Sequence, residues 1–496
     1  MRSLHIARVA SEIIPFAKTG GLADVCGSLP RCLAGMGHRC SLFMPAYGMV
    51  LRKGLPIEAT EVGFTISMAG RQVACRLLKT RLPSSDVEVY LIDQPQYFER
   101  ESLYGDRQGD YRDNSERFAF FCKSVVHAIE QLDLRIDIAH CHDWQAGLIP
   151  AYMATGFGQY GWPHRAASVM TIHNLAYQGR FWHYDMALTG LDWRYFNWRE
   201  MEFYGDVSYL KTGIVFADKV TTVSPTYASE IRRPEHGCGL DGVLRDRGDD
   251  LIGIVNGVDY DQWSPATDAF LPKTYDASTW RDGKAACKAH LQSLFGLPIE
   301  PSTPLVGIIG RMASQKGWDL IIETLRQWLN NRDVQWVILG TGQREYQDEL
   351  QNLAAHVPHR LGLRLEFSDA LAHNIEAGAD LFLMPSQYEP CGLNQLYSLR
   401  YGTVPVVHAT GGLVDTVVDA NTDAVRTGTA SGFSFHEYSI SAMEDALERA
   451  LALYRTQSQT WGQVVKTGMQ QDWSWGQSAA KYLAIYEDCL SKKKLS

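Results

Sequence analysis

The sequence predicts an α/β fold with doubly wound parallel sheets, and two observations support this prediction. Short apolar runs alternate with longer stretches of helical periodicity along the whole chain, as in strands joined by crossover helices. Glycine-rich or polar segments follow several of these runs, at the strand ends where such folds bind ligands. The predicted strands are 4–10, 40–44, 87–92, 136–140, 168–172, 219–223, 251–255, 305–309, 334–339, 363–367, 381–384 and 404–408.

Chain length and one turn divide this pattern into two domains. A chain of 496 residues is longer than one hydrophobic core usually supports. Asn256-Gly257-Val258-Asp259 is a turn signal after a predicted strand, and a polar stretch over 264–304 follows it. We therefore expect an N-terminal domain over 1–258 and a C-terminal domain over 259–471.

Charge and composition exclude several classes of protein. The 47 Lys and Arg residues against 56 Asp and Glu leave a net charge of −9, whereas a nucleic-acid partner needs a basic face. Ten cysteines without a CxxC pair indicate free thiols in a reducing compartment. No apolar run reaches the roughly 20 residues that cross a bilayer, and the first strand begins too early for a targeting peptide. We expect a cytoplasmic protein with no nucleic-acid or membrane partner.

A glycine-rich segment, Lys18-Thr19-Gly20-Gly21-Leu22-Ala23-Asp24, follows the first strand and opens a helix. Glycines let the backbone approach an anion, a helix N-terminus favours negative charge, and Lys18 adds a cation. A similar segment, Thr410-Gly411-Gly412-Leu413-Val414-Asp415, follows a strand of the second half. Two interpretations of this similarity remain open. Each half of the chain could carry an anion site, or two ordinary strand-to-helix turns could match by chance.

Charged side chains also follow strands in the second half. Arg311 and Lys316 come after a strand, and a planar fork beside a compact cation suits a pyrophosphate. The alternative, two solvated charges at a helix start, is opposed by the helix dipole. Glu389 precedes the helix start at Cys391-Gly392-Leu393-Asn394, where backbone N–H groups are unpaired. Glu389 could bind sugar hydroxyls or simply complement the helix dipole.

Two polar segments end strands in the first half. They are His140-Cys141-His142-Asp143-Trp144 and Thr171-Ile172-His173-Asn174-Leu175, and doubly wound folds place functional residues at such positions. The His-x-His pair lacks the third and fourth ligands that a closed metal site needs, so we expect no metal. The GxGxxG pattern over 237–242 has no preceding strand, which excludes a dinucleotide-binding turn.

Taken together, these segments resemble those of bacterial glycogen synthases and plant soluble starch synthases, the ADP-glucose-using branch of the two-lobed GT-B glycosyltransferases. The resemblance spans nearly the whole chain and rests on 18–24, 173–179, 223–227, 256–259, Arg311 with Lys316, 389–393 and 410–413. It implies two Rossmann-like domains that face a deep interdomain cleft, the C-terminal helix over 472–496 completing the first domain. It also implies a retaining glucosyltransferase that moves glucose from ADP-glucose to the non-reducing end of an α-1,4-glucan, without a cofactor or metal.

The same resemblance implies residue roles. It assigns catalysis to His173, Asp143, Arg311, Lys316 and Glu389, and donor binding to Lys18, Gly20, Gly21, Asp24, Asn256, Phe367, Cys391, Gly392, Leu393, Tyr397, Thr410, Gly411 and Gly412. Arg311 and Lys316 stabilise the charge that grows on the diphosphate as the C1–O bond breaks. Phe367 stands where the family tends to carry an aromatic that stacks on adenine. Tyr397 replaces a glutamate that binds ribose in many retaining GT-B enzymes.

Two alternative functions share parts of this pattern. A UDP-sugar transferase or an epimerase could use the same fold, although Tyr397 and the Lys-Thr-Gly-Gly segment count against both. A non-catalytic glucan-binding relative would not need Arg311 and Lys316. No carboxylate is placed as a covalent nucleophile, unlike in retaining glycosidases, so the resemblance implies same-face displacement. It also implies a location in the cytoplasm, or in the plastid stroma for a mature plastid form.

Overall fold

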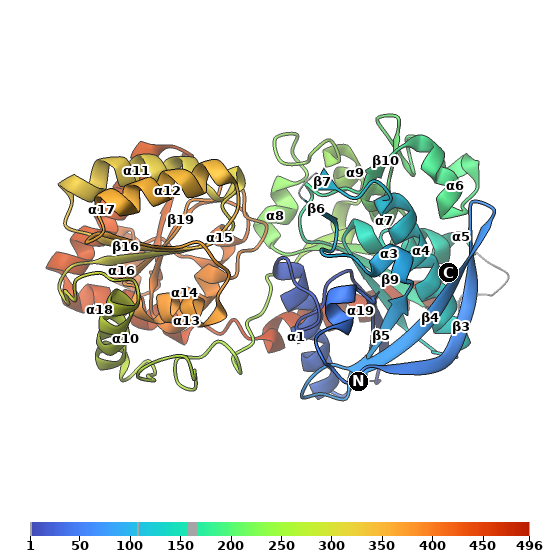
Figure 1. Cartoon of the computed structure of the whole chain (residues 1–496), viewed down its shortest axis with the longest axis horizontal. Helices are drawn as coiled ribbons and strands as arrows, with labels where there is room; N and C mark the ends of the chain where they lie inside the picture. The colour runs from blue at the N-terminus through green and yellow to red at the C-terminus, as the bar shows by residue number, and fades with distance from the viewer. Residues whose placement is uncertain (1, 107–108, 157–165, 496) are drawn as a thin grey trace. The chain divides into compact units, whose positions relative to one another are not determined.

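The structure is a computed structural model that describes residues 2–106, 109–156 and 166–495. The chain forms two compact units (Figure 1): the N-terminal unit comprises Met1–Gly257 and Trp475–Ser496, and the C-terminal unit comprises Val258–Ser474. Within the described ranges, no helix combines the length and the apolar content that crossing a membrane requires.

The N-terminal unit is built on a nine-stranded sheet with the order β14-β13-β9-β8-β1-β2-β5-β4-β3. Its central strands are parallel and buried along their whole length, which explains why they read as nearly continuous apolar runs. The strands are β1 (His5–Val9), β2 (Arg39–Pro45), β3 (Glu58–Met68), β4 (Arg71–Arg81), β5 (Glu88–Asp93), β8 (Ile138–His142), β9 (Ala167–Ile172), β13 (Lys219–Thr222) and β14 (Leu251–Gly253).

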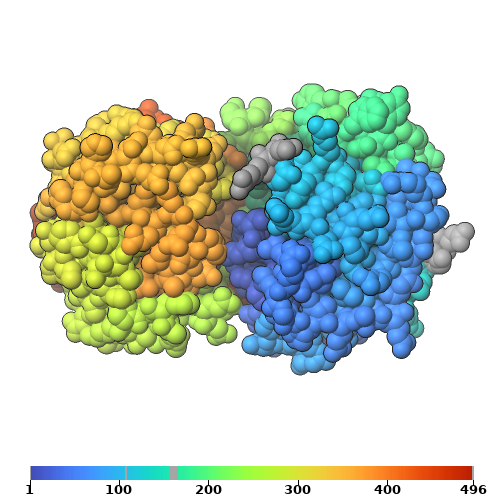
Figure 2. Space-filling view, in the orientation of Figure 1, coloured from blue at the N-terminus to red at the C-terminus, as the bar shows by residue number. Residues whose placement is uncertain are grey.

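One edge of this sheet is an antiparallel hairpin that the sequence prediction missed. β3 pairs with β4, and β4 pairs antiparallel with β5, so the hairpin extends the sheet at the outer border of the N-terminal unit (Figures 1 and 2). Exposed residues alternate with more buried ones along β3. Such half-exposed strands carry polar residues at every second position, and a search for continuous apolar runs overlooks them.

Helices cover both faces of the N-terminal sheet. α1 packs on α19, which contacts β9, while α4, α5 and α7 pack against one another or the sheet on the other side (Figure 1). The helices are α1 (Gly21–Gly35), α2 (Gly48–Leu51), α3 (Pro95–Phe98), α4 (Asn114–Gln131), α5 (Ile149–Thr155), α6 (Met186–Thr189), α7 (Tyr209–Phe216), α8 (Pro225–Glu230), α9 (Asp241–Asp246) and α19 (Trp475–Leu495). Two small antiparallel sheets join β6 (Gly105–Asp106) to β7 (Gly109–Asp110), and β10 (Arg180–Phe181) to β12 (Asp206–Ser208) and β11 (Glu202–Phe203).

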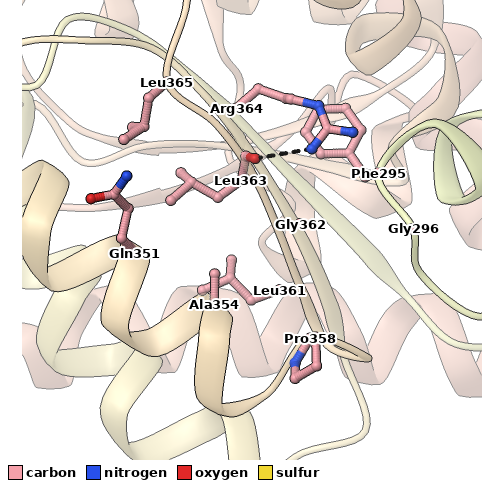
Figure 3. Close-up of a pocket in the computed structure, with 10 residues that line it drawn as sticks. All are labelled: Phe295, Gly296, Gln351, Ala354, Pro358, Leu361, Gly362, Leu363, Arg364 and Leu365. Carbon is pink, nitrogen blue, oxygen red and sulfur yellow. Dashed lines mark hydrogen bonds between the residues drawn. The ribbon is translucent and has the colours of Figure 1, made fainter.

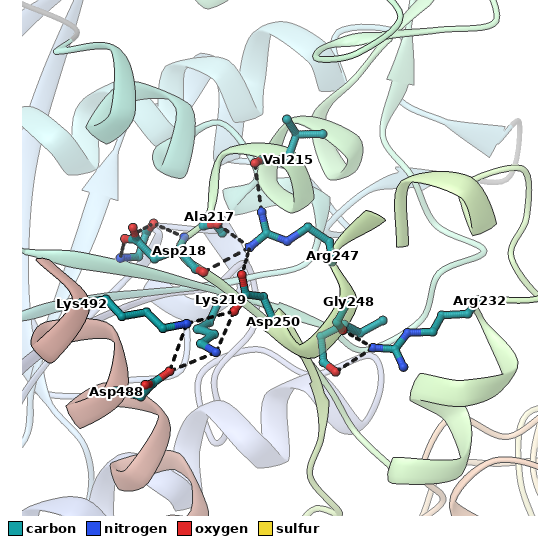
Figure 4. Close-up of polar contacts among 12 residues, drawn as sticks. Val215, Ala217, Asp218, Lys219, Arg232, Arg247, Gly248, Asp250, Asp488 and Lys492 are labelled. Atoms are coloured by element: carbon teal, nitrogen blue, oxygen red, sulfur yellow. Dashed lines mark hydrogen bonds and ion pairs between the residues drawn. The ribbon is translucent and has the colours of Figure 1, made fainter. Parts of the chain in front are cut away.

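A network of ion pairs attaches the C-terminal helix α19 to this unit (Figure 4). Lys219 Nζ lies 2.7 Å from an Asp250 oxygen and 3.0 Å from an Asp488 oxygen of α19. Lys492 of the same helix lies 3.4 Å from Asp250. Only 7% of the Lys219 side chain is exposed, so its two carboxylate partners offset the cost of burying the ammonium group. The network therefore holds a segment from the end of the chain against strands near its middle.

The C-terminal unit contains a six-stranded parallel sheet with the order β17-β16-β15-β18-β19-β20. Its strands are β15 (Leu305–Ile309), β16 (Gln335–Leu339), β17 (Leu361–Arg364), β18 (Leu381–Met384), β19 (Val404–His408) and β20 (Phe433–Phe435). The predicted strand over 363–367 is displaced, because β17 begins and ends earlier. Phe367 therefore lies in the loop that follows β17 and not on a strand.

Helices sandwich this second sheet as well (Figure 1). α11, α12 and α17 cover one face, while α10, α13, α14 and α18 cover the other. The helices are α10 (Trp280–Leu294), α11 (Trp318–Asn331), α12 (Arg344–His356), α13 (Asp369–Gly378), α14 (Asn394–Tyr401), α15 (Gly412–Thr416), α16 (Thr422–Thr427), α17 (Ile440–Thr456) and α18 (Ser458–Gln470). The α/β fold predicted from the alternating pattern is confirmed in both units.

Candidate active site

Each sheet has one point at which the strand order reverses, and doubly wound folds bind ligands there. In the N-terminal unit the chain runs from β1 to β2 on one side and returns to β8 on the other. In the C-terminal unit it runs from β15 to β16 and returns to β18. The loops after β1, β8, β15 and β18 carry the segments around Lys18, Asp143, Lys316 and Glu389. The segments around His173 and Thr410 follow β9 and β19, which are the neighbours of β8 and β18 in their sheets.

In the C-terminal unit, Lys316 and Glu389 meet at this point. Lys316 Nζ lies 2.5 Å from Glu389 Oε2, and Ser386 Oγ donates to the same oxygen at 3.0 Å. Glu389 is only 6% exposed, so these two donors are needed to offset the cost of burying its negative charge. Arg311 lies in the same loop, after β15, and is exposed. The loop after β15 therefore offers two cations, one already held by a buried carboxylate.

The glycines of the Thr410–Gly412 segment permit a close backbone approach to the Glu389 loop. Gly411 has φ +47°, and a Cβ there would lie 2.0 Å from the Glu389 carbonyl oxygen. A Cβ on Gly412 would lie 2.2 Å from the Cys391 carbonyl oxygen, and the Gly412 N–H donates to Glu389 O at 3.1 Å. Steric exclusion, and not only turn geometry, therefore requires glycine at both positions.

The segment Cys391-Gly392-Leu393 leads into α14. Gly392 has φ +72°, and Leu393 is the residue before the first helical turn, without a side-chain cap. The Cys391 and Gly392 carbonyl oxygens accept from Gln395 Nε2 at 2.9 and 3.1 Å. These contacts hold the start of the helix in place, next to the Lys316–Glu389 pair.

The residues expected to contact the nucleoside differ sharply in exposure. Phe367 is 79% exposed in the loop after β17, where its ring is accessible to a stacking partner. Tyr397 is buried, and its ring stacks on that of Trp263, with the ring centroids 3.8 Å apart and an interplanar angle of 2°. Thr410 is buried as well. The structure thus gives Tyr397 a packing role that the sequence did not reveal.

In the N-terminal unit, the glycine-rich loop is fastened by a buried carboxylate. Glu12 accepts from Thr19 Oγ1 at 2.6 Å and from the Tyr104 hydroxyl at 2.7 Å, and it also accepts from the Thr19 N–H. Lys18 Nζ lies 2.8 Å from Asp24 Oδ1. Gly20 precedes α1 and has open space around its Cβ direction. Lys18 must therefore exchange or share its Asp24 contact if it binds an anion.

Asp143, directly after β8, combines burial with an unusual backbone. Its φ is +54° and ψ is −175°, a region that non-glycine residues occupy at a cost of about 1–3 kcal/mol. Asp143 Oδ1 accepts the His173 N–H at 2.7 Å. Burial raises the pKa of Asp143 to about 7. Such strain at a strand end, together with a raised pKa, is typical of functional sites.

His173 follows β9 and is linked to residues that the sequence analysis did not assign to the site. His173 Nε2 lies 3.0 Å from His142 Nδ1, and His142 Nε2 lies 2.8 Å from Arg8 Nη2. Burial first, and Arg8 second, lower the pKa of His173 to about 3. The signal that could have identified Arg8 is a charged residue in the middle of the apolar run that forms β1. In the part of the chain described here, no cluster of three metal-ligating side chains occurs.

Asn256 follows β14 at the end of the N-terminal unit's main segment. It is buried, and its Oδ1 has no donor among the described residues. An orphaned buried carbonyl carries a cost of about 1–3 kcal/mol, which a ligand hydroxyl could relieve.

A cavity of about 420 Å³ lies elsewhere, beside the edge strand β17 (Figure 3). Its lining comes from residues 295–296 and 361–365 together with Gln351, Ala354 and Pro358, so it contains none of the predicted site residues. Arg364 spans its wall and donates to Leu294 O at 2.7 Å. This cavity is therefore distinct from the reversal point of the sheet.

Two doubly wound units with cations and glycine-rich loops at the ends of their parallel strands are the architecture of the two-domain α/β glycosyltransferases. Residues 5–246 match the model of the starch synthase catalytic domain, and residues 293–463 match that of glycosyl transferases group 1. The chain belongs to the glycogen and starch synthase family.

Individual relatives support this assignment over the full length. A glycogen synthase of Rhodopirellula baltica is 47% identical, and the match covers 98% of each chain. Glycogen synthase 2 of Geobacter sulfurreducens is 45% identical over 97% of this chain and 98% of its own. The catalytic domain of Starch Synthase IV from Arabidopsis thaliana, bound to ADP and acarbose, has a TM-score of 0.91 at 32% identity, with 99% and 100% of the two chains covered.

Proposed function

We propose that this glycosyltransferase moves glucose from ADP-glucose to the non-reducing end of an α-1,4-glucan and retains the α configuration. The observation that carries the proposal is the Lys316–Glu389 pair at the reversal point of the C-terminal sheet. Family membership and the ADP and acarbose bound to the starch synthase relative support the same donor and the same kind of acceptor.

The C-terminal unit would bind the donor through its nucleotide and diphosphate. Arg311 and Lys316 pair with the diphosphate, whose negative charge increases as the glucosyl bond breaks. Preorganised donors of this kind contribute several kcal/mol to catalysis. The amides of Gly411 and Gly412 and the segment Cys391-Gly392-Leu393 would add further N–H groups, since they adjoin Glu389.

Adenosine would contact a different group of residues. The exposed ring of Phe367 is suited to stack on adenine. Thr410 and Tyr397 would contribute through the backbone or the surrounding surface, because both side chains are buried. In the N-terminal unit, Lys18, Gly20, Gly21 and Asp24 would contact the donor with the N–H groups and charges at the start of α1.

The glucosyl unit would be oriented by His173, Asp143, Asn256 and Glu389. In same-face displacement, the acceptor hydroxyl attacks C1 from the side on which the diphosphate leaves. The C1–O bond to phosphate breaks, a new C1–O bond to the glucan forms, and the hydroxyl proton passes to a phosphate oxygen. Isolation of a glucosyl ester on Glu389 or Asp143 would instead establish a covalent route.

The decisive experiment measures glucose incorporation into glycogen from ADP-glucose and, separately, from UDP-glucose. Lys316→Ala is expected to lower incorporation from ADP-glucose about 10²–10³-fold, the typical loss of one preorganised donor. Lys466→Ala, a change of an exposed lysine on α18, is the matched control and should retain full activity. Preference for UDP-glucose would indicate the related sugar transferases. Binding without transfer from either donor would favour an epimerase or a glucan-binding protein.

We also propose the cytoplasm as the compartment, or the plastid stroma for a plastid form. None of the ten cysteines, all of which lie in the described part of the chain, forms a disulfide, and reduced thiols persist in a reducing compartment.

A further inference from the structure

Arg8 is an unusual residue for the centre of a parallel sheet. It lies in the middle of β1 and is 1% exposed. No carboxylate among the described residues lies within ion-pair distance, and Arg8 instead contacts two histidines of β8, His140 and His142. Its Nη1 also lies 3.5 Å from the Tyr486 hydroxyl of α19. The register of β1 and β8 places Arg8 opposite His140, so all three side chains share one face of the sheet.

Only one assignment of donors and acceptors fits the hydrogen bonds among Arg8, His142 and His173. An arginine side chain has donors and no acceptor, so His142 Nε2, 2.8 Å from Arg8 Nη2, must accept. A neutral imidazole carries one N–H, which places the His142 proton on Nδ1. His142 Nδ1 faces His173 Nε2 at 3.0 Å, so His173 Nε2 accepts and the His173 proton lies on Nδ1.

His142 is neutral in this arrangement, because the nitrogen that accepts from Arg8 carries no proton. Burial lowers the pKa of His142 well below its ordinary value, with neighbouring His140 and Arg8 adding to the effect. His173 Nδ1 makes no hydrogen bond to any residue within 2–106, 109–156 or 166–495, and the ring is only partly buried. One N–H of His173 is therefore directed away from the relay and is available to a ligand.

We propose that Arg8 is a positioning residue that acts through His142 to fix the tautomer of His173, so that His173 presents an Nδ1–H donor to an oxygen of the bound sugar. This inference rests on the proposed function, in which His173 orients the glucosyl unit. It assigns His173 the role of a neutral hydrogen-bond donor and excludes a role as general base through Nδ1. Without Arg8, both tautomers of His142 and His173 would be accessible.

A matched pair of variants separates the relay from simple packing. In His142→Gln the amide oxygen accepts from Arg8 and the amide N–H₂ donates to His173, so the direction of the relay is preserved. His142→Leu fills a similar volume without donating or accepting. Arg8→Met removes the donor at the start of the relay. Thermal unfolding of each variant identifies any that fails to fold.

The primary readout is the tautomer of His173, measured by long-range ¹H–¹⁵N correlation spectra of ¹⁵N-histidine-labelled protein, with His173→Gln used to assign its signals. Wild type and His142→Gln are expected to show the Nδ1–H form, and His142→Leu a mixture or the Nε2–H form. In glycogen elongation assays, kcat should fall about tenfold or more in His142→Leu and Arg8→Met, and remain within about threefold of wild type in His142→Gln. ADP affinity should remain unchanged in all three variants.

The outcomes distinguish this inference from the proposed function. An Nε2–H tautomer of His173 in the wild type, or equal spectra and equal activity of His142→Gln and His142→Leu, overturns the relay. A wild-type protein that transfers no glucose contradicts the proposed function, while the tautomer measurement still decides the relay by itself.

Discussion

Asp143→Asn is expected to stabilise the protein, and the gain should increase from pH 5 to pH 8. Asp143 is 9% exposed, and burial raises the pKa of its carboxyl group from 3.8 to about 7. At pH values below the unfolded-state pKa, Asp143 is protonated in both the folded and the unfolded protein. Its burial then carries no cost of removing a charge from water. As pH rises towards the folded-state pKa, the unfolded chain releases this proton first, and stability is lost.

The size of this effect follows from the shift. One pKa unit corresponds to about 1.4 kcal/mol, so a shift of about three units costs the native state about 4 kcal/mol at pH 8 and about 2 kcal/mol at pH 5. Asparagine carries no charge, keeps an oxygen that accepts the His173 N–H, and tolerates positive φ better than most residues. The variant's advantage should therefore grow by about 2 kcal/mol between pH 5 and pH 8.

Urea unfolding followed by tryptophan fluorescence at pH 5, 6, 7 and 8 measures this difference. Asp249→Asn, a change of an exposed aspartate in the same unit, is the control and should show no pH-dependent gain. The same advantage for Asp143→Asn at all four pH values, or a wild type that is the more stable protein at pH 8, would refute the reasoning. Glucosyl transfer should fall in the variant even as stability rises, because strain and burial at this residue are attributed to function.

Three further predictions concern other residues of the two units. Phe367→Ala should leave thermal stability within about 0.5 kcal/mol, since the ring is 79% exposed, while raising KM for ADP-glucose; an unchanged KM would remove Phe367 from the donor site. Gly411→Ala should destabilise the protein by about 2 kcal/mol or more, because its Cβ would lie 2.0 Å from Glu389 O, whereas Gly428→Ala, with positive φ but open space, should cost about 1 kcal/mol; equal costs in urea titrations would contradict the steric argument. Lys219→Met should lower the unfolding free energy by about 1–2 kcal/mol and increase proteolysis at the C-terminal helix; unchanged protection of that helix would show that the ion pairs do not retain it.

Some of the site could be predicted because its signals are local in the sequence. The apolar runs that became β15, β18 and β19 have the predicted bounds, since strands buried on both faces are recognisable from composition alone. Arg311, Lys316 and Glu389 could be selected because residues after parallel strands share one edge of the sheet. The hairpin β3–β4 escaped prediction because a half-exposed strand resembles a polar loop.

Other features of the site depend on contacts between residues far apart in the chain. Arg8 and His142 are 134 positions apart, and only the register of β1 with β8 brings them to one face. Similarly, Tyr397 packs beneath Trp263 because the polar stretch after the inter-domain turn folds back over α14. The local hydrophobic periodicity of the sequence predicts neither contact.

Local signals in the sequence predicted the fold class and the family and singled out candidate site residues, because strand periodicity, glycine turns and charged strand ends are properties of short segments. The conformation and contacts of these residues became visible in the folded protein: the strained backbone and raised pKa of Asp143, the pairing of Lys316 with Glu389, and the relay from Arg8 to His173. The physical reason is that burial and hydrogen-bond partners set protonation and orientation, and both arise when strands distant in sequence are joined in one sheet.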